Sequence, residues 1–151
     1  MKSTSMLGRT FCGLLIFFVG SVYTPNAIAR TALYGPNTTQ MLIDIKPRDF
    51  PNGINPGSHG VIPVAILTNH DFDAHTVDPH SVRFGKQGTE ATAMQFVMVD
   101  VDGDGDLDLL LHFRIQDTQI QCGEKSASFT AHTSCGQAIA GSDSVVTVGC
   151  R

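Results

Sequence analysis

Residues 99–115 constrain the fold most, because two patterns of period two follow one another there without a break. Five aspartates occupy alternate positions of a nine-residue window: Asp100, Asp102, Asp104, Asp106 and Asp108. Hydrophobic residues then continue the alternation: Leu107, Leu109, Leu111, Phe113 and Ile115. Alternation of this length predicts a β-strand with one buried face and argues against an α-helix after the aspartates.

Five carboxylates this close together need a neutralising partner, and Ca²⁺ is the simplest, since it is a hard cation that prefers oxygen ligands. The string Asp-x-Asp-x-Asp-Gly-x-x-Asp matches the first nine positions of an EF-hand-type calcium loop. Positions 1, 3 and 5 of such a loop ligate through side chains, position 6 is Gly, position 7 offers its carbonyl, and position 9 ligates directly or through water. In that order the positions are Asp100, Asp102, Asp104, Gly105, Asp106 and Asp108.

Position 12 of the loop departs from the EF-hand pattern. A bidentate Glu is expected there, but the residue is Leu111, whose place in the alternation directs it into the core. The sequence therefore predicts a Ca²⁺ site between two strands instead of between two helices. Two alternatives stay open: a solvated acidic turn without metal, and a catalytic Mg²⁺ or Mn²⁺ site.

The rest of the chain predicts short strands joined by segments rich in Pro, Gly and Asn. We expect loops at 47–60 and 85–92, and turns at Gly136 and Gly141. Pro63 indicates an edge strand or a bulge for its segment. The expected strands are 41–46, 61–67, 82–84, 93–99, 107–115, 126–132 and 144–148. The sum predicts an all-β fold, an antiparallel β-sandwich of about seven to eight strands with an inserted calcium-binding loop.

The first 29 residues have the features of a secretory signal peptide. Lys2 and Arg9 precede a short apolar core at 13–20, and Ala27-Ile-Ala29 forms a small-residue cleavage site. We therefore expect residues 30–151 to be one secreted domain, extracellular or periplasmic, with no membrane insertion after cleavage. An uncleaved membrane anchor is the alternative.

The charge of the expected domain is acidic. Loss of Lys2 and Arg9 reduces ten basic residues to eight against 14 acidic ones, so the formal net charge changes from −4 to −6. Most of this imbalance lies in the aspartate run. Such a chain has no electrostatic basis for binding nucleic acid or anionic membranes.

Three cysteines remain after residue 29, in a chain whose expected compartment preserves disulfides. We favour a Cys122–Cys150 bridge, because it would hold the last strand at the C-terminus. Cys135 stands in the turn-like string Thr-Ser-Cys-Gly and is expected to be the unpaired thiol. The other pairings and a fully reduced chain stay open.

The histidines do not form a recognisable site in the sequence. His59, His70, His75 and His80 alternate with aspartates, but their spacing follows no known metal-ligand pattern, and we expect polar loop residues. His112, on the strand after the aspartates, is expected to contact a carboxylate or solvent. No Ser/His/Asp order, phosphate loop or separate carboxylate pair supports a hydrolase.

The order of several sequence blocks resembles a recurrent family of secreted prokaryotic domains. The blocks are Ile43-Asp-Ile-Lys-Pro47, Pro51-Asn-Gly-Ile-Asn-Pro56, Gly60-Val-Ile-Pro-Val-Ala-Ile-Leu67, Val77-Asp-Pro79, Val82-Arg-Phe-Gly85 and Asp100-Val-Asp-Gly-Asp-Gly-Asp-Leu-Asp108. The resemblance covers about residues 42–150 and implies an extracytoplasmic β-rich module with a calcium-type loop, without an activity to carry over. Val99 departs from the family, which tends to have an acidic residue there.

The aspartate run is also similar to integrin-type propeller repeats and to one half of a dockerin, although this chain has a single copy. The expected function is a secreted calcium-binding module with a structural Ca²⁺. Its expected role is binding or scaffolding, with an extracellular protein or polysaccharide as the unknown partner. The alternative is a small secreted enzyme or enzyme inhibitor that uses loops near the metal. A concave site with a perturbed acid or base would favour the enzyme.

Overall fold

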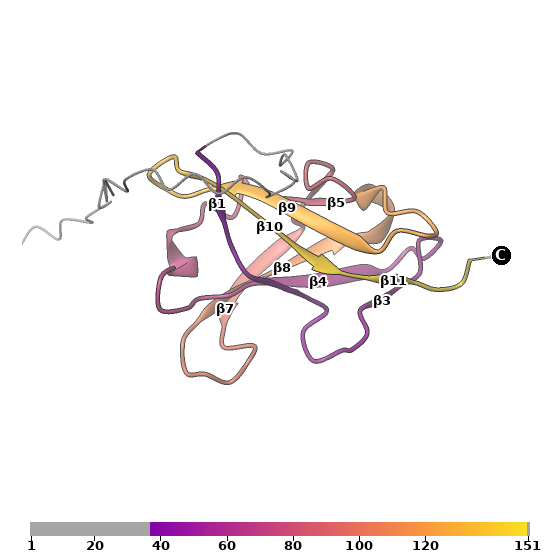
Figure 1. The fold of residues 1–151 in the computed structure, drawn as a ribbon, viewed down its shortest axis with the longest axis horizontal. Coiled ribbons are helices and arrows are strands. Elements are labelled where there is room, and N and C mark those ends of the chain that lie inside the picture. Colours follow the sequence, from indigo (N-terminus) through magenta and orange to yellow (C-terminus); the bar gives the residue numbers. More distant parts are fainter. Residues whose placement is uncertain (1–36, 151) are drawn as a thin grey trace, which may run out of the picture. The chain divides into compact units, whose positions relative to one another are not determined.

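The computed structural model describes residues 37–150, which contain eleven short strands and two 3₁₀ helices (Figure 1). The strands form three sheets. The five-stranded sheet has the order β1 (Thr39–Gln40), β10 (Ala138–Ser144), β9 (Ser126–His132), β5 (Arg83–Gly85), β6 (Ala91–Thr92). The four-stranded sheet has the order β2 (Ile43–Ile45), β4 (Val61–Ile66), β8 (Asp108–Arg114), β7 (Gln95–Val99). The remaining elements are the pair β3 (Gly53–Ile54) and β11 (Val146–Thr147), and the helices η1 (Ala74–Thr76) and η2 (Ile115–Thr118).

The core lies between the two larger sheets. Leu109, Leu111 and Phe113 of β8 are at most 2% exposed, as the alternation predicts. Phe84 of β5 meets Phe113 across the core, with ring centroids 5.1 Å apart. Apart from the parallel pairs β1–β10 and β3–β11, the strands pair antiparallel. The predicted antiparallel β-sandwich is therefore confirmed, although residues 37–150 contain eleven strands where we expected seven to eight.

Several predicted boundaries are wrong. The strands β3 and β6 lie in segments expected to be loops, because two-residue ladders carry no detectable periodicity. The strand β10 runs through Gly141, where we expected a turn. A side chain at Gly141 would collide with the carbonyl oxygen of Met41 and the ring of Phe129, so close packing requires glycine there.

Pro63 does not mark a sheet edge, contrary to the prediction. The strand β4 is an interior strand that pairs with both β2 and β8. The register places Pro63 opposite Lys46, and the backbone N–H of Lys46 donates to the carbonyl oxygen of Pro63 (2.8 Å). Since the N–H and C=O of one residue face the same neighbouring strand, the missing N–H faces the point where β2 ends. A proline is tolerated at that position.

Asp143 of β10 connects the two larger sheets near the exposed edge of β2. Its Oδ2 accepts hydrogen bonds from the backbone N–H of Ile45 (3.1 Å) and from Nδ2 of Asn52 (2.9 Å). The carboxylate thus satisfies an edge donor that no strand pairs with, and it closes this side of the sandwich.

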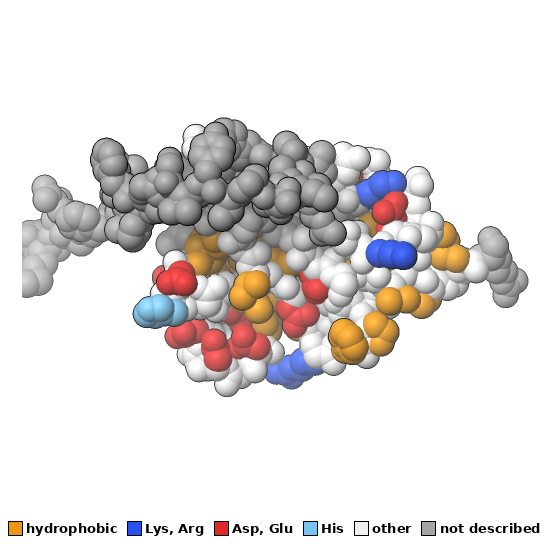
Figure 2. Space-filling model, viewed as in Figure 1, with side chains coloured by type: hydrophobic (Ala, Val, Ile, Leu, Met, Phe, Trp, Pro, Cys, Tyr) orange, Lys and Arg blue, Asp and Glu red, His pale blue; other side chains and the backbone are white. Residues whose placement is uncertain are grey.

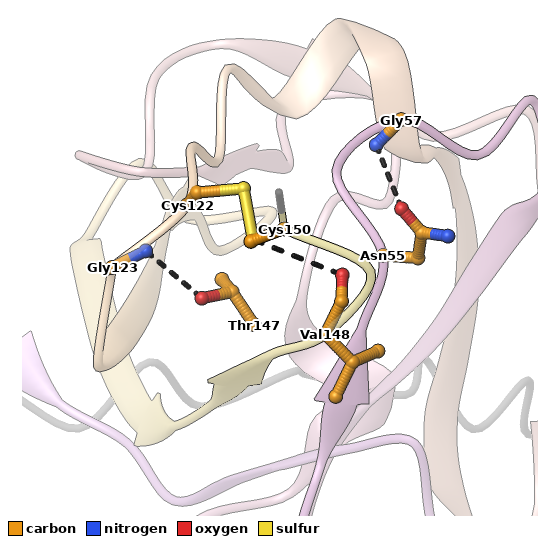
Figure 3. Close-up of a disulfide and its surroundings, with 7 residues drawn as sticks. All are labelled: Asn55, Gly57, Cys122, Gly123, Thr147, Val148 and Cys150. Atoms are coloured by element: carbon orange, nitrogen blue, oxygen red, sulfur yellow. Dashed lines mark hydrogen bonds between the residues drawn. A yellow bond between two sulfur atoms is a disulfide. The ribbon is translucent and has the colours of Figure 1, made fainter.

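The predicted disulfide between Cys122 and Cys150 is present, with Cα atoms 5.8 Å apart (Figure 3). Nearby, the backbone N–H of Gly123 donates to Oγ1 of Thr147 (2.9 Å), so β11 is held beside the segment that follows η2. The prediction for Cys135 is wrong, because this residue is disulfide-bonded as well.

The expected signal peptide, residues 1–29, lies outside the described residues. Between residues 37 and 150, no helix has the length and apolar composition that crossing a membrane requires.

Removal of the Cys122–Cys150 bridge should destabilise the fold. The bridge closes a sequence separation of 28 residues, which in the chain-entropy model contributes about 3 kcal/mol. We expect the double variant Cys122→Ala/Cys150→Ala to lower the free energy of unfolding by about that amount in urea titrations. An unchanged midpoint would show that the β3–β11 pairing holds the C-terminus without the bridge.

Candidate metal centre

The aspartate run forms the connection between β7 and β8, two neighbouring strands of the four-stranded sheet. Asp100 directly follows β7, and Asp108 is the first residue of β8. Figure 1 shows this connection projecting beyond the ends of both strands. The antiparallel pairing of β7 with β8 therefore brings the two ends of the run together.

Three of the five aspartates meet at the base of the loop. Carboxylate oxygens of Asp100, Asp102 and Asp108 all lie within 4.8 Å of one another. Among residues 37–150 this is the one group of three or more possible metal-ligating side chains. Asp104 and Asp106 lie outside the group: Oδ1 of Asp104 accepts from the backbone N–H of Asp106 (2.9 Å), and Asp106 is exposed.

The loop folds back on Asp100 through two glycines. The carboxylate of Asp100 accepts hydrogen bonds from the backbone N–H of Gly103 (2.6 Å) and of Gly105 (3.1 Å). Both glycines have left-handed backbones, with φ values of 86° and 98°. Other residues adopt such φ values at a cost, so the Gly at position 6 has the structural role that a calcium-type loop requires.

Asp108 is the fixed member of the group. Its side chain is buried, Oδ1 accepts from the backbone N–H of Thr68 (2.9 Å), and Oδ2 accepts from that of Val101 (2.9 Å). The hydroxyl of Thr68 donates to the carbonyl oxygen of Leu107 (2.6 Å). No sequence pattern predicted a role for Thr68, because its contact with the loop arises only when β4 and β8 pair.

Loss of solvation and mutual repulsion both act on the carboxylates of the loop. Loss of solvation is the largest cause that raises the pKa of Asp102. The hydrogen bond from the backbone N–H of Asp104 lowers this pKa, whereas the negative charges of the nearby carboxylates raise it further; these are Asp104, Asp108 and Asp100. None of the ion pairs within residues 37–150 includes an aspartate of this loop. The carboxylates are therefore close together without a cationic side chain to compensate them.

Asp44 on β2 is a further acidic residue that interacts electrostatically with the loop. The pKa of Asp44 on β2 is raised by partial burial, then by the charge of Asp143 and then by that of Asp102. Alternation in β2 explains its position, since Ile43 and Ile45 face the core and Asp44 faces the other way. The sequence pattern contained this signal, but no motif connected Asp44 with the loop.

The twelfth loop position supplies no ligand. Leu111 is fully buried in the core, as predicted, so position 12 offers no oxygen ligand to a cation in the loop. A cation held here would keep coordination positions open for water or for another molecule.

The histidines of residues 59–80 are not brought together as a metal site. Nδ1 of His75 lies 3.1 Å from Oδ1 of Asp73, and the ring of His80 packs edge-on against Phe96. Within the described residues, no histidine belongs to a group of three possible ligands. His112 is half-buried on β8, and its Nδ1 has no hydrogen-bond partner in residues 37–150.

Fold and site together define a β-sandwich domain with an acidic loop between two adjacent strands. Comparisons with protein-family models, with curated proteins and with solved structures found no match to this chain. The resemblance to secreted prokaryotic domains therefore stays a prediction from the sequence blocks.

The buried carboxylate of Asp108 should stabilise the fold even without metal. In Asp108→Asn, one acceptor oxygen becomes an NH₂ group that faces a backbone N–H, so we expect a loss of about 2–3 kcal/mol in the free energy of unfolding, measured with urea in EGTA. Asp106→Asn, an exposed position of the same loop, is the matched control and should leave stability unchanged. Equal effects of the two variants would contradict an anchoring role for Asp108.

Proposed function

We propose that this protein is a secreted calcium-binding β-sandwich module in which one Ca²⁺ stabilises the loop between β7 and β8. The observation that carries the proposal is the convergence of three carboxylates, Asp100, Asp102 and Asp108, within 4.8 Å and without a cationic side chain in an ion pair. A divalent cation removes their repulsion and uses the oxygen ligands that are present.

The remaining ligands come from the tip of the loop. Asp104 and the carbonyl of Asp106 occupy positions 5 and 7 of the calcium-type pattern, and a modest tightening of the tip around the ion would add them. With Leu111 at position 12, we expect weak binding of roughly 10⁻⁴–10⁻³ M, the range of extracellular calcium modules. Such an affinity suits a compartment outside the cell.

The role of the ion is structural. Asp108 connects the loop to the segment just after β4 through the backbone N–H of Thr68, so ordering the loop also orders this end of the two central strands. The disulfide Cys122–Cys150 and the signal-like residues 1–29 support a location outside the cytoplasm. There the module would bind or scaffold an extracellular protein or polysaccharide.

A small secreted enzyme or enzyme inhibitor is the second candidate. A hollow beside the loop provides the concave site that this alternative needs. Its described lining contains a single carboxylate, Asp100, which already belongs to the acidic group. No separate acid and base lines the hollow within residues 37–150, so binding explains the site with fewer assumptions.

Calcium titration by isothermal calorimetry should detect one site per chain. Asp100→Asn and Asp102→Asn each remove a charged ligand, and we expect either change to weaken binding by about tenfold or more. Asp71→Asn, an exposed aspartate outside the loop, is the control and should bind like the unaltered protein. Absence of a calcium heat, or equal affinities for all variants, would refute the proposed site.

Chelation should lower the melting temperature. A ligand that binds only the native state stabilises it by about 2.7 kcal/mol at a hundred times its dissociation constant. We therefore expect thermal unfolding in excess CaCl₂ to occur at a clearly higher temperature than in EGTA, with MgCl₂ giving a smaller shift because Mg²⁺ retains its water. Identical melting curves with CaCl₂ and EGTA would exclude a structural role for the ion.

A further inference from the structure

A hollow of about 300 Å³ lies on the outer face of the four-stranded sheet, next to the acidic loop. Figure 1 shows the loop after β2 and the loop between β7 and β8 projecting on the same side of this sheet. The hollow is lined by Pro47, Arg48, Pro63, Val99, Asp100, Val101 and Leu110. Its volume is at the lower end of the range of small-molecule sites.

The floor of the hollow is apolar although it faces away from the core. Alternation directs Pro63 of β4, Leu110 of β8 and Val99 of β7 to the outer face. The outer face of a sandwich is normally polar. Val99 is 37% exposed, so it offers apolar surface to another molecule.

Arg48 provides the positive charge of the lining, which also contains the carboxylate of Asp100. In the turn after β2, Lys46 pairs with Asp49 (2.7 Å), whereas the Arg48 guanidinium has no ion pair or hydrogen bond with any residue of the described chain. The backbone of Arg48 is left-handed, with φ 74°, a conformation that L-residues rarely adopt. Figure 2 shows basic and acidic side chains close together along this side of the molecule.

We propose that the hollow binds a carboxylate group carried on an apolar chain. The planar guanidinium of Arg48 pairs with both carboxylate oxygens, and the apolar chain covers Pro63, Val99 and Leu110. An unpaired guanidinium beside an apolar floor fits such an amphipathic anion. A neutral apolar ligand would leave Arg48 without a partner.

Calcium strengthens this binding, a part of the inference that rests on the proposed function. Asp100 belongs both to the acidic group and to the wall of the hollow. The five loop carboxylates have a formal charge of −5, which one Ca²⁺ reduces to −3, so the ion weakens the repulsion of an anion. The residual negative charge of the loop favours a monoanion over a dianion.

The test is a titration of ¹⁵N-labelled protein with hexanoate, followed by NMR in CaCl₂. We expect saturable shifts of the amide signals of Val99, Val101 and Leu110, and an affinity for uncharged hexanamide that is weaker by about fivefold. Arg48→Gln should lower the hexanoate affinity to the hexanamide value. Arg114→Gln, an exposed arginine at the far end of β8, is the matched control and should leave the affinity unchanged.

The outcomes separate this inference from the calcium proposal. Absence of saturable shifts, equal affinities for hexanoate and hexanamide, or equal losses in Arg48→Gln and Arg114→Gln would overturn the carboxylate site, even if calorimetry detects calcium. A repeat in EGTA should weaken hexanoate binding by about threefold or more. Superimposable titrations in CaCl₂ and EGTA would overturn the calcium dependence. The comparison of Arg48→Gln with Arg114→Gln would still decide whether the hollow binds the carboxylate.

Discussion

The two hydrogen bonds accepted by the buried carboxylate of Asp108 are the interaction on which the rest of the site depends. One connects the first residue of β8 to Thr68 at the end of β4, and the other connects it to Val101 at the start of the loop. A buried charge is tolerated only with such partners, and here the partners are backbone N–H groups, which no substitution except proline removes. The sheet thereby determines where the acidic loop begins and ends.

The loop combines a base held by backbone hydrogen bonds with an exposed tip. Asp100 and Asp108 are held at the base by backbone donors, whereas Asp104 and Asp106 stand outside the carboxylate group. Loss of solvation, and then repulsion from the neighbouring carboxylates, raises the pKa of Asp102.

Sequence reasoning was most successful where one local pattern determines the structure. The alternation in β8 predicted its buried face, and the position of Cys150 near the C-terminus led to the correct disulfide. It failed for β3 and β6, whose two-residue ladders exist only because a partner strand lies beside them. The contribution of Arg48 to the hollow could not be predicted for the same reason, since β2, β4, β7 and β8 must first assemble.

The open surroundings of the loop glycines have a consequence for protein engineering. A Cβ atom added at Gly103 or Gly105 would meet no other atom within 4 Å, so the tip of the loop extends away from the sandwich. Because Asp108 is held by Thr68 and Val101, which lie outside the tip, we expect the tip to be exchangeable if the new segment keeps the two N–H groups that donate to Asp100. A lanthanide-binding sequence inserted there would place a luminescent or paramagnetic probe at a defined corner of the domain.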